Sequence, residues 1–199
     1  MIYKLLIDPL LKSSHARAAS MVLPDDKVLD VACGNGTLAL MIAEKNGGRV
    51  TGIDLDVAML KQAEQTRKKA GATSVRFIQA DATDLSNFGN NEFNTAVISM
   101  AIHQFNPTEG LKVLTEMKRV AEKIIVVDYA FPMNSGFYGW FARTIEWIAG
   151  GEHMRNFKQY IKNGGIDSLL SKTGLHSTKR YQQGKGTLMV SFCEILKQG

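Results

Sequence analysis

The sequence predicts an α/β fold in which a doubly wound, mostly parallel seven-stranded sheet ends in an antiparallel hairpin. Strand-like and helix-like segments alternate along most of the chain, a rhythm typical of a parallel sheet with helices on both faces. A glycine-rich turn follows the first strand-like segment, Lys27–Val31, and leads into a helical pattern. Near the end of the chain, two strand-like segments flank residues 182–186, an arrangement typical of a hairpin.

The expected elements follow one another at regular spacing. Runs of apolar and β-branched residues predict the parallel strands Lys27–Val31, Arg49–Ile53, Ser74–Gln79, Phe93–Ser99 and Lys123–Tyr129. The fourth of these is apolar enough to be buried on both faces. Helical spacing of apolar residues, with proline or glycine at the boundaries, predicts the helices Pro9–Val22, Thr37–Lys45, Val57–Ala70, Pro107–Val120 and Ile166–Lys172. The hairpin strands are Leu175–Tyr181 and Thr187–Leu196.

All 199 residues are expected to form one domain, since a chain of this length buries a sizeable core. Residues 1–26 are expected to form an N-terminal helical cap, and residues 132–163 break the alternation as a helical insertion. This insertion has apolar side chains at helical spacing, at Phe137, Trp140, Phe141, Ile145 and Ile148. Such a stripe predicts packing on the core or a lid over an apolar ligand. Contact with a membrane surface is the less favoured alternative.

Composition and charge narrow the class of protein. The sequence has no apolar run of 18 residues and no signal-peptide pattern, and Cys33 and Cys193 have neither disulfide-framework nor metal-ligand spacing. A reduced, cytoplasmic protein without a metal site is therefore expected. The net charge of +5 arises within residues 151–199, which contain eight Lys and Arg but only three Asp and Glu. An ordinary solvated surface is favoured there. Nucleic-acid binding is not expected, because the sequence has no basic run with interleaved aromatic residues.

The turn after the first strand indicates a nucleotide-like ligand. The strand carries Asp30 and runs into Gly34 and Gly36, and a helix follows at once. Such a turn presents backbone N–H groups, and glycine lets a ligand approach the backbone closely. Asp54 and Asp81 follow the next two strands, whose carboxyl ends line the ligand crevice of a parallel sheet. Asp54 lies 18 residues after Gly36, a distance at which a carboxylate holds ribose hydroxyls.

Three segments resemble the class I S-adenosylmethionine-dependent methyltransferases, which have a Rossmann-like fold. They are Leu29–Gly36, Gly52–Leu60 and Gln79–Leu85, and the likeness extends from about Val28 to the C-terminus. Within this family the chain is most similar to the ubiquinone/menaquinone-biosynthesis type. The resemblance implies methyl transfer from S-adenosylmethionine to a small, partly apolar acceptor, with S-adenosylhomocysteine as the product.

The resemblance also implies positions for the cofactor. Asp30 and the glycine loop would hold its methionine part, Asp54 its ribose hydroxyls, and Asp81 with the Ala82 N–H its adenine. The expected cofactor-binding residues are Asp30, Ala32, Cys33, Gly34, Gly36, Asp54, Leu55, Met59, Asp81, Ala82 and Ser99.

Leu55 and Met59 would flank the adenine ring. Ala32 departs from the family, which usually has glycine there, so the loop has less backbone freedom. Asp56 stands where a small hydroxyl residue is common, and it is expected to cap the helix that follows.

Two other classes of function stay open at this point. The spacing Gly34-x-Gly36-x-x-Ala39 also fits the dinucleotide fingerprint, so an NAD-linked oxidoreductase is one alternative. A pyrophosphate needs N–H groups without a nearby anion, whereas Asp30 suits the ammonium group of a methionine moiety. The other alternative is a non-catalytic scaffold that keeps the cofactor fold, against which the intact set of acids and glycines argues.

Two histidines are the candidates for acid–base chemistry. A sulfonium methyl is already electrophilic, so a base is needed only when the acceptor arrives protonated. His103 follows Phe93–Ser99 and is expected near the crevice, as a base, as a hydrogen-bonding partner of the acceptor, or as a structural cap of its loop. His153 is the second candidate. His15 and His176 are interpreted as surface residues.

Four residues are expected to contact the acceptor: Tyr129, Trp140, Arg155 and Tyr160. Tyr129 closes the fifth strand on the ligand side, and Trp140 belongs to the aromatic stripe of the insertion. Arg155 and Tyr160 accompany His153 in a polar cluster that suits an anionic or polar group. A solvated helix start with Tyr160 packed beneath it is the favoured alternative for this cluster. The sequence gives no indication of the oligomeric state.

Overall fold

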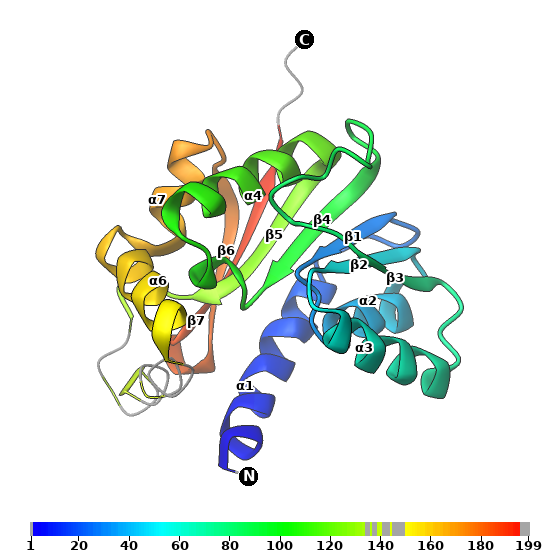
Figure 1. Cartoon of the computed structure of the whole chain (residues 1–199), viewed down its shortest axis with the longest axis horizontal. Helices are drawn as coiled ribbons and strands as arrows, with labels where there is room; N and C mark the ends of the chain where they lie inside the picture. The colour runs from blue at the N-terminus through cyan, green and yellow to red at the C-terminus, as the bar shows by residue number, and fades with distance from the viewer. Residues whose placement is uncertain (1, 134–135, 137–138, 141–143, 145–149, 196–199) are drawn as a thin grey trace.

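The computed structural model describes residues 2–133, 136, 139, 140, 144 and 150–195, with the backbone alone for residues 2–10 (Figure 1). The described helices are α1 (Ile2–Ala19), α2 (Thr37–Asn46), α3 (Val57–Ala70), α4 (Pro107–Val120), α6 (Gly151–Lys162) and α7 (Gly165–Lys172), with the 3-10 turns η1 (Ile102–Gln104) and η2 (Gly184–Gly186). The strands are β1 (Val28–Val31), β2 (Val50–Asp54), β3 (Val75–Gln79), β4 (Phe93–Ser99), β5 (Ala121–Tyr129), β6 (Ser177–Gln183) and β7 (Leu188–Glu194).

One seven-stranded sheet runs through the molecule in the order β3-β2-β1-β4-β5-β7-β6. Strands β1 to β5 pair in parallel, and β7 pairs antiparallel with both β5 and β6. The predicted mostly parallel sheet and its C-terminal hairpin are therefore confirmed. Because β1 lies between β2 and β4, the chain winds outward from β1 in both directions. Open sheets bind ligands at the carboxyl ends of the strands where this reversal occurs.

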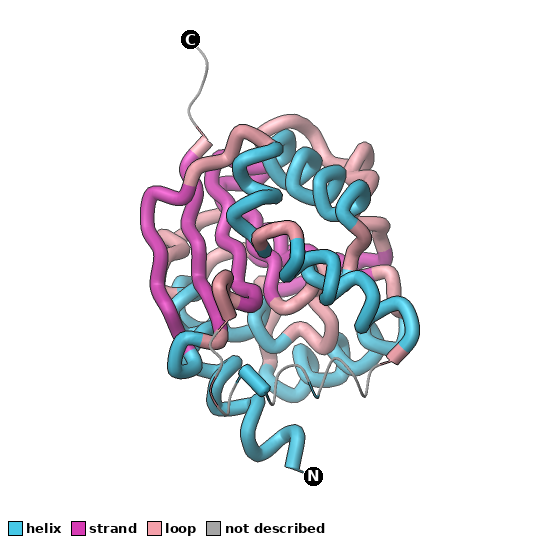
Figure 2. The backbone as a smooth tube through the Cα atoms, turned by 90° about the vertical axis from the view of Figure 1, so that its left-hand side faces the viewer, coloured by secondary structure: helices cyan, strands magenta, loops and turns pink. Residues whose placement is uncertain are grey.

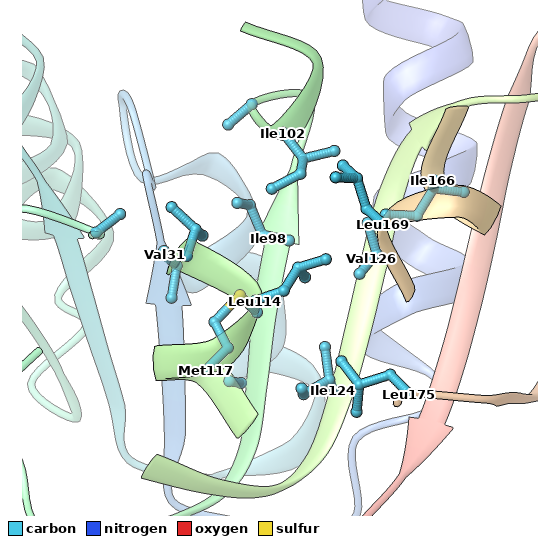
Figure 3. Close-up of a cluster of buried hydrophobic side chains, with 14 of the residues drawn as sticks. Val31, Ile98, Ile102, Leu114, Met117, Ile124, Val126, Ile166, Leu169 and Leu175 are labelled. Atoms are coloured by element: carbon cyan, nitrogen blue, oxygen red, sulfur yellow. The ribbon is translucent and has the colours of Figure 1, made fainter. Parts of the chain in front are cut away.

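Helices cover both faces of the sheet (Figure 2). α4, α6 and α7 pack on one face, where Leu114, Met117 and Leu169 lie against Ile98 and Val126 (Figure 3). α1 and α2 pack on the opposite face, which carries the alternate residues of the same strands. The core thus consists of two apolar layers, and the carboxyl ends of the strands stay available at the sheet edge.

Local sequence signals account for the helices whose bounds are predicted correctly. The Asn106 side chain caps α4 by accepting from the N–H groups of Thr108 and Glu109, at 3.0 Å each. Pro107 takes the first helical position, where no N–H partner is needed. Asp56 caps α3 as predicted, by accepting from two backbone N–H groups of the first turn. The bounds of α3, α4 and β4 match the prediction.

The predicted bounds of the first helix are wrong. α1 begins at Ile2 rather than Pro9 and ends at Ala19 rather than Val22. Proline is favoured in the first helical turn, so a start at Pro9 is predicted from the sequence. In the structure Pro9 lies inside the helix, where its missing N–H removes one backbone hydrogen bond.

The hairpin strands and the turn after β4 also differ from the prediction. β6 begins at Ser177 rather than Leu175, because the Leu175 N–H donates to the Leu170 carbonyl at 2.8 Å and so belongs to the end of α7. β7 spans Leu188–Glu194 rather than residues 187–196. η1 is not predicted, since a single 3-10 turn is too short to show periodicity in the sequence.

The segment at 132–163 is described in part. Its polar second half forms α6, which buries Phe157 and Tyr160. Phe137, Phe141, Ile145 and Ile148 of the predicted aromatic stripe lie outside the described residues. None of the helices described has the length and apolar character needed to cross a membrane.

Candidate functional site

A cavity of about 760 Å³ opens at the carboxyl ends of the central strands. Asp30, Asp54 and Asp81 line it, from the ends of three neighbouring strands, and Asp56 joins them. All of the expected cofactor-binding residues except Gly36 line the cavity. No lysine or arginine does so within the described part of the chain. The structure therefore brings the acids singled out by the sequence into one acid-rich site.

Residues 32–36 turn tightly from β1 into α2. Ala32, Gly34 and Gly36 have φ values of +52°, +53° and +77°. A residue with a Cβ costs about 1–2 kcal/mol in this left-handed region, so Ala32 carries backbone strain that a glycine would not have. A Cβ at Gly36 would also overlap the Phe77 ring of β3, whereas one at Gly34 would meet nothing within 4 Å. Gly36 thus lets the loop pack on β3 without lining the cavity itself.

Two of the cavity carboxylates are held by backbone groups. Asp54 accepts from the Gly34 N–H at 2.7 Å through Oδ2 and from the Asp56 N–H at 2.9 Å through Oδ1. Asp81 Oδ1 accepts from the N–H and the hydroxyl of Thr83, both at 2.8 Å. An ionised carboxylate has about four acceptor positions, so both side chains keep capacity for ligand hydroxyl or amino groups.

Asp30 differs from the other acids because it is almost completely buried. Its side chain is 1% exposed, and Oδ2 has no hydrogen-bond partner among the described residues. Burial and, to a smaller extent, the nearby charge of Asp54 raise the pKa of this carboxyl to about 8, although the backbone N–H of Ala39 acts in the opposite direction. Asp30 is therefore protonated at neutral pH until a cation pairs with it. Burial also raises the pKa of the neighbouring Cys33 thiol, which stays protonated and unreactive.

His15 is buried and lines the cavity, so its interpretation as a surface residue is wrong. The side chain is 8% exposed, and Nε2 lies 2.8 Å from Ser99 Oγ at the end of β4. Burial lowers the pKa of the imidazole to about 4, so the ring is neutral at neutral pH. Leu11 and Ala18 share one helical face with His15, a spacing that predicts burial. His176, in contrast, is exposed as expected.

His103 lies in a buried aromatic cluster. Its ring is 1% exposed, and Nδ1 lies 2.7 Å from Asp128 Oδ1. The rings of Tyr129, Phe157 and Tyr160 lie against it, with centroid distances of 4.8, 6.1 and 6.3 Å. The Tyr160 hydroxyl donates to the Tyr129 carbonyl at 3.2 Å. In the part of the chain that the structure describes, His103, Tyr129 and Tyr160 do not line the cavity.

The remaining predicted residues lie nearer the surface. His153 is exposed at the start of α6 and lines the cavity. Arg155 pairs with Glu152 at 2.6 Å, and Trp140 is 59% exposed. Neither Arg155 nor Trp140 lines the cavity as far as the chain is described. Asn156 Nδ2 donates to the carbonyl of Gln104 at 2.7 Å and so holds α6 against η1 at the cavity wall.

Known proteins resemble this chain in both sequence and structure. Residues 28–123 match the family model of a methyltransferase domain. The chain is 28% identical over 195 residues to the ubiquinone/menaquinone biosynthesis C-methyltransferase UbiE of Bdellovibrio bacteriovorus, covering 90% of this chain and 80% of that protein. It is 30% identical over 141 residues to the demethylmenaquinone methyltransferase of Listeria welshimeri, covering 67% of this chain. The match spans 58% of the Listeria protein, which is just over half its length.

A solved structure gives the same fold. A SAM-dependent methyltransferase from Aquifex aeolicus matches with a TM-score of 0.66 at 18% identity, covering 98% of this chain and 93% of that one. Fold, cavity and relatives together place this chain among the class I S-adenosylmethionine-dependent methyltransferases, with S-adenosylmethionine as its cofactor. Within that class it is close to the UbiE type. Nothing in these relatives supports the oxidoreductase alternative.

Proposed function

We propose that this protein transfers the methyl group of S-adenosylmethionine to a quinol-type aromatic acceptor. The names of the Bdellovibrio and Listeria relatives support this class of acceptor. The observation that carries the proposal is the make-up of one continuous cavity. Its acid-rich end is formed by the strand ends, and its other end carries Met100, Ala101 and Phe105 beside the polar groups of Gln104 and His153. A polar nucleoside and an apolar ring therefore fit in one cavity.

At the acid-rich end, the residues fit the chemical groups of S-adenosylmethionine. Asp30 has a buried acceptor atom without a partner among the described residues, which suits the ammonium group. Asp54 keeps acceptor capacity for the ribose hydroxyls, and Asp81 with the Ala82 N–H, which also line the cavity, would bind the adenine edge. Leu55 is 66% exposed at this cavity, an apolar surface on which an adenine ring can pack. These are the roles that the family resemblance implies, and the donors and acceptors of the site are compatible with them.

At the apolar end, the chain positions the acceptor and excludes water. When bound, S-adenosylmethionine supplies an electrophilic methyl group, so aligning the acceptor is the main task of the protein. We propose that Met100 and Phe105 contact the aromatic ring and that an imidazole nitrogen of His153 takes the proton that the acceptor loses. His103 acts as a positioning residue, because its bond to Asp128 ties η1 to β5 behind this wall.

α6, the described part at the end of the 132–163 segment, closes this end of the cavity in our proposal. α6 supplies His153, and the bond from Asn156 to Gln104 holds the helix against η1. In this arrangement the chain works as one domain, with α1 as a cap on one side and α6 on the other. A cytoplasmic location stays a prediction from the sequence.

The proposed reaction is tested with methyl-labelled S-adenosylmethionine and a reduced 1,4-naphthoquinol that has one unsubstituted ring carbon. We expect label in the naphthoquinol product, and mass spectrometry of its fragments separates carbon from oxygen methylation. Asp54→Ala serves as the inactive control. Binding of the cofactor without transfer to the naphthoquinol would refute the proposed acceptor, and absence of transfer to any of a panel of phenols and amines would favour the scaffold alternative.

A further inference from the structure

Three polar side chains meet on the sheet face that α1 covers. Val28 and Val97 belong to the apolar layer on this face, so Asp30 and Ser99, each two residues further along its strand, face the same side. Asp30 pairs in register with Val97, which makes Ser99 its diagonal neighbour on β4. His15 of α1 reaches down to this corner and bonds Ser99.

The His15 ring has one nitrogen with a partner and one without. Nε2 lies 2.8 Å from Ser99 Oγ, while Nδ1 is buried and has no hydrogen-bond partner among the described residues. The neutral imidazole carries a single N–H. When the Ser99 hydroxyl donates to Nε2, the proton of the ring resides on Nδ1. This corner then contains both an unpaired donor, His15 Nδ1, and an unpaired acceptor, Asp30 Oδ2.

An amino-acid group would satisfy both atoms. Its ammonium donates to Asp30 and its carboxylate accepts from an N–H, and the two groups are separated by one carbon atom. The cavity has no lysine or arginine in its described lining, so a carboxylate that enters it depends on neutral donors. Among the side chains of this corner, His15 offers such a donor in a buried position, where a hydrogen bond to a charged group is strong.

We propose that His15 is a ligand-binding residue whose Nδ1–H donates to the carboxylate of the amino-acid end of the bound nucleoside, while Ser99 holds the required tautomer. This inference rests on the proposed function, in which S-adenosylmethionine occupies this cavity. It adds a residue of the N-terminal helix to the cofactor site and makes α1 part of that site rather than only a cover.

The test compares S-adenosylmethionine with its decarboxylated analogue, by titration calorimetry without any acceptor. His15→Gln keeps a polar group near Ser99 but places no donor at the Nδ1 position, whereas His15→Asn keeps that donor. We expect His15→Gln to weaken S-adenosylmethionine binding about ten- to a hundredfold, the size typical of a bond to a charged group. His15→Asn should stay within about threefold of the wild type, and the analogue should bind wild type and His15→Gln equally.

Several results would decide against this role. Equal weakening of both ligands by His15→Gln would mean that His15 only supports the structure, and unchanged binding of S-adenosylmethionine would mean that it does not contact the carboxylate. Ser99→Ala is a second variant, expected to weaken S-adenosylmethionine but not the analogue, and an effect on neither or on both contradicts the proposal. His176→Gln, at an exposed histidine, is the matched control. A wild type that binds neither ligand would refute the proposed cofactor use itself.

Discussion

The Asp54 carboxylate accepts a hydrogen bond from the Gly34 backbone N–H at 2.7 Å. Its second oxygen accepts from the Asp56 N–H at 2.9 Å, at the start of α3. One side chain thus connects β2, the glycine loop and α3, and it also lines the cavity. Loop geometry and ligand binding are coupled at this residue, so an experiment on Asp54 must monitor both.

The glycine loop yields a prediction about stability. Gly36→Ala places a Cβ against the Phe77 ring at a φ of +77°, so it combines backbone strain with overpacking. We expect a loss of about 3 kcal/mol in the free energy of unfolding. Gly34→Ala is the matched control, because it has the positive φ but open space, and it should lose about 1 kcal/mol. Urea unfolding measures both, and equal losses would show that Phe77 does not limit this position.

The raised pKa of Asp30, about 8, predicts a pH dependence of stability. The folded protein holds a proton on Asp30 that the unfolded chain releases near pH 4. Stability from this group is therefore present at low pH and is lost as pH rises toward 8. Between pH 6.5 and 8, ligand-free wild type should lose about 2 kcal/mol relative to Asp30→Asn. A difference between the two proteins that does not change with pH would contradict this assignment.

The lowered pKa of His15 makes stability depend on pH in the direction opposite to that of Asp30, over a lower pH range. Its pKa is lowered to about 4, so the folded protein binds fewer protons than the unfolded chain below pH 6.5. Stability from this group is present above the unfolded pKa and is lost as pH falls toward 4. In the wild type the slopes of His15 and Asp30 oppose each other between pH 4 and 6.5. Asp30→Asn should therefore show a stability that rises with pH across this range, measured by urea unfolding at each pH.

The buried pair of His103 and Asp128 lies outside the cavity lining, so we expect a substitution there to lower stability without weakening cofactor binding. His103→Phe keeps a ring in the aromatic cluster but removes the 2.7 Å bond to Asp128. Since a buried carboxylate loses a partner, we expect a loss of about 2–4 kcal/mol in the free energy of unfolding. S-adenosylhomocysteine affinity should stay within about threefold of the wild type, because His103 does not line the described cavity. His153→Phe, at an exposed site, should leave stability unchanged; an equal loss there would contradict the account.

Most helices and strands can be predicted from the sequence because the residues that mark their ends lie within or beside them. Asn106 and Pro107 mark the start of α4 within two residues, and the apolar run of β4 has clear ends. The predicted start of α1 is wrong because proline is most common in the first turn of a helix, whereas Pro9 lies in the interior of α1. No single segment specifies the strand order, since register depends on contacts between distant elements.

The candidate site also has one part that can be predicted from the sequence and one part that cannot. Its acid-rich end comes from short motifs at the ends of β1, β2 and β3, so Asp30, Asp54 and Asp81 are accessible from spacing alone. The other end is assembled from α1, η1 and α6, which are far apart in the sequence. The position of His15 beside Ser99 depends on how α1 crosses the sheet, and no local pattern specifies a contact across 84 residues.

Calorimetric titration with S-adenosylhomocysteine is the most direct test that this cavity is the cofactor site. We expect one molecule to bind per chain and Asp54→Ala to weaken binding about a hundredfold, because the ribose hydroxyls lose a carboxyl acceptor. Asp84→Ala, at an acid outside the cavity, is the control. Far-ultraviolet circular dichroism and melting confirm that both variants are folded. Equal affinity for wild type and Asp54→Ala, or binding of NAD in place of S-adenosylhomocysteine, would contradict this assignment.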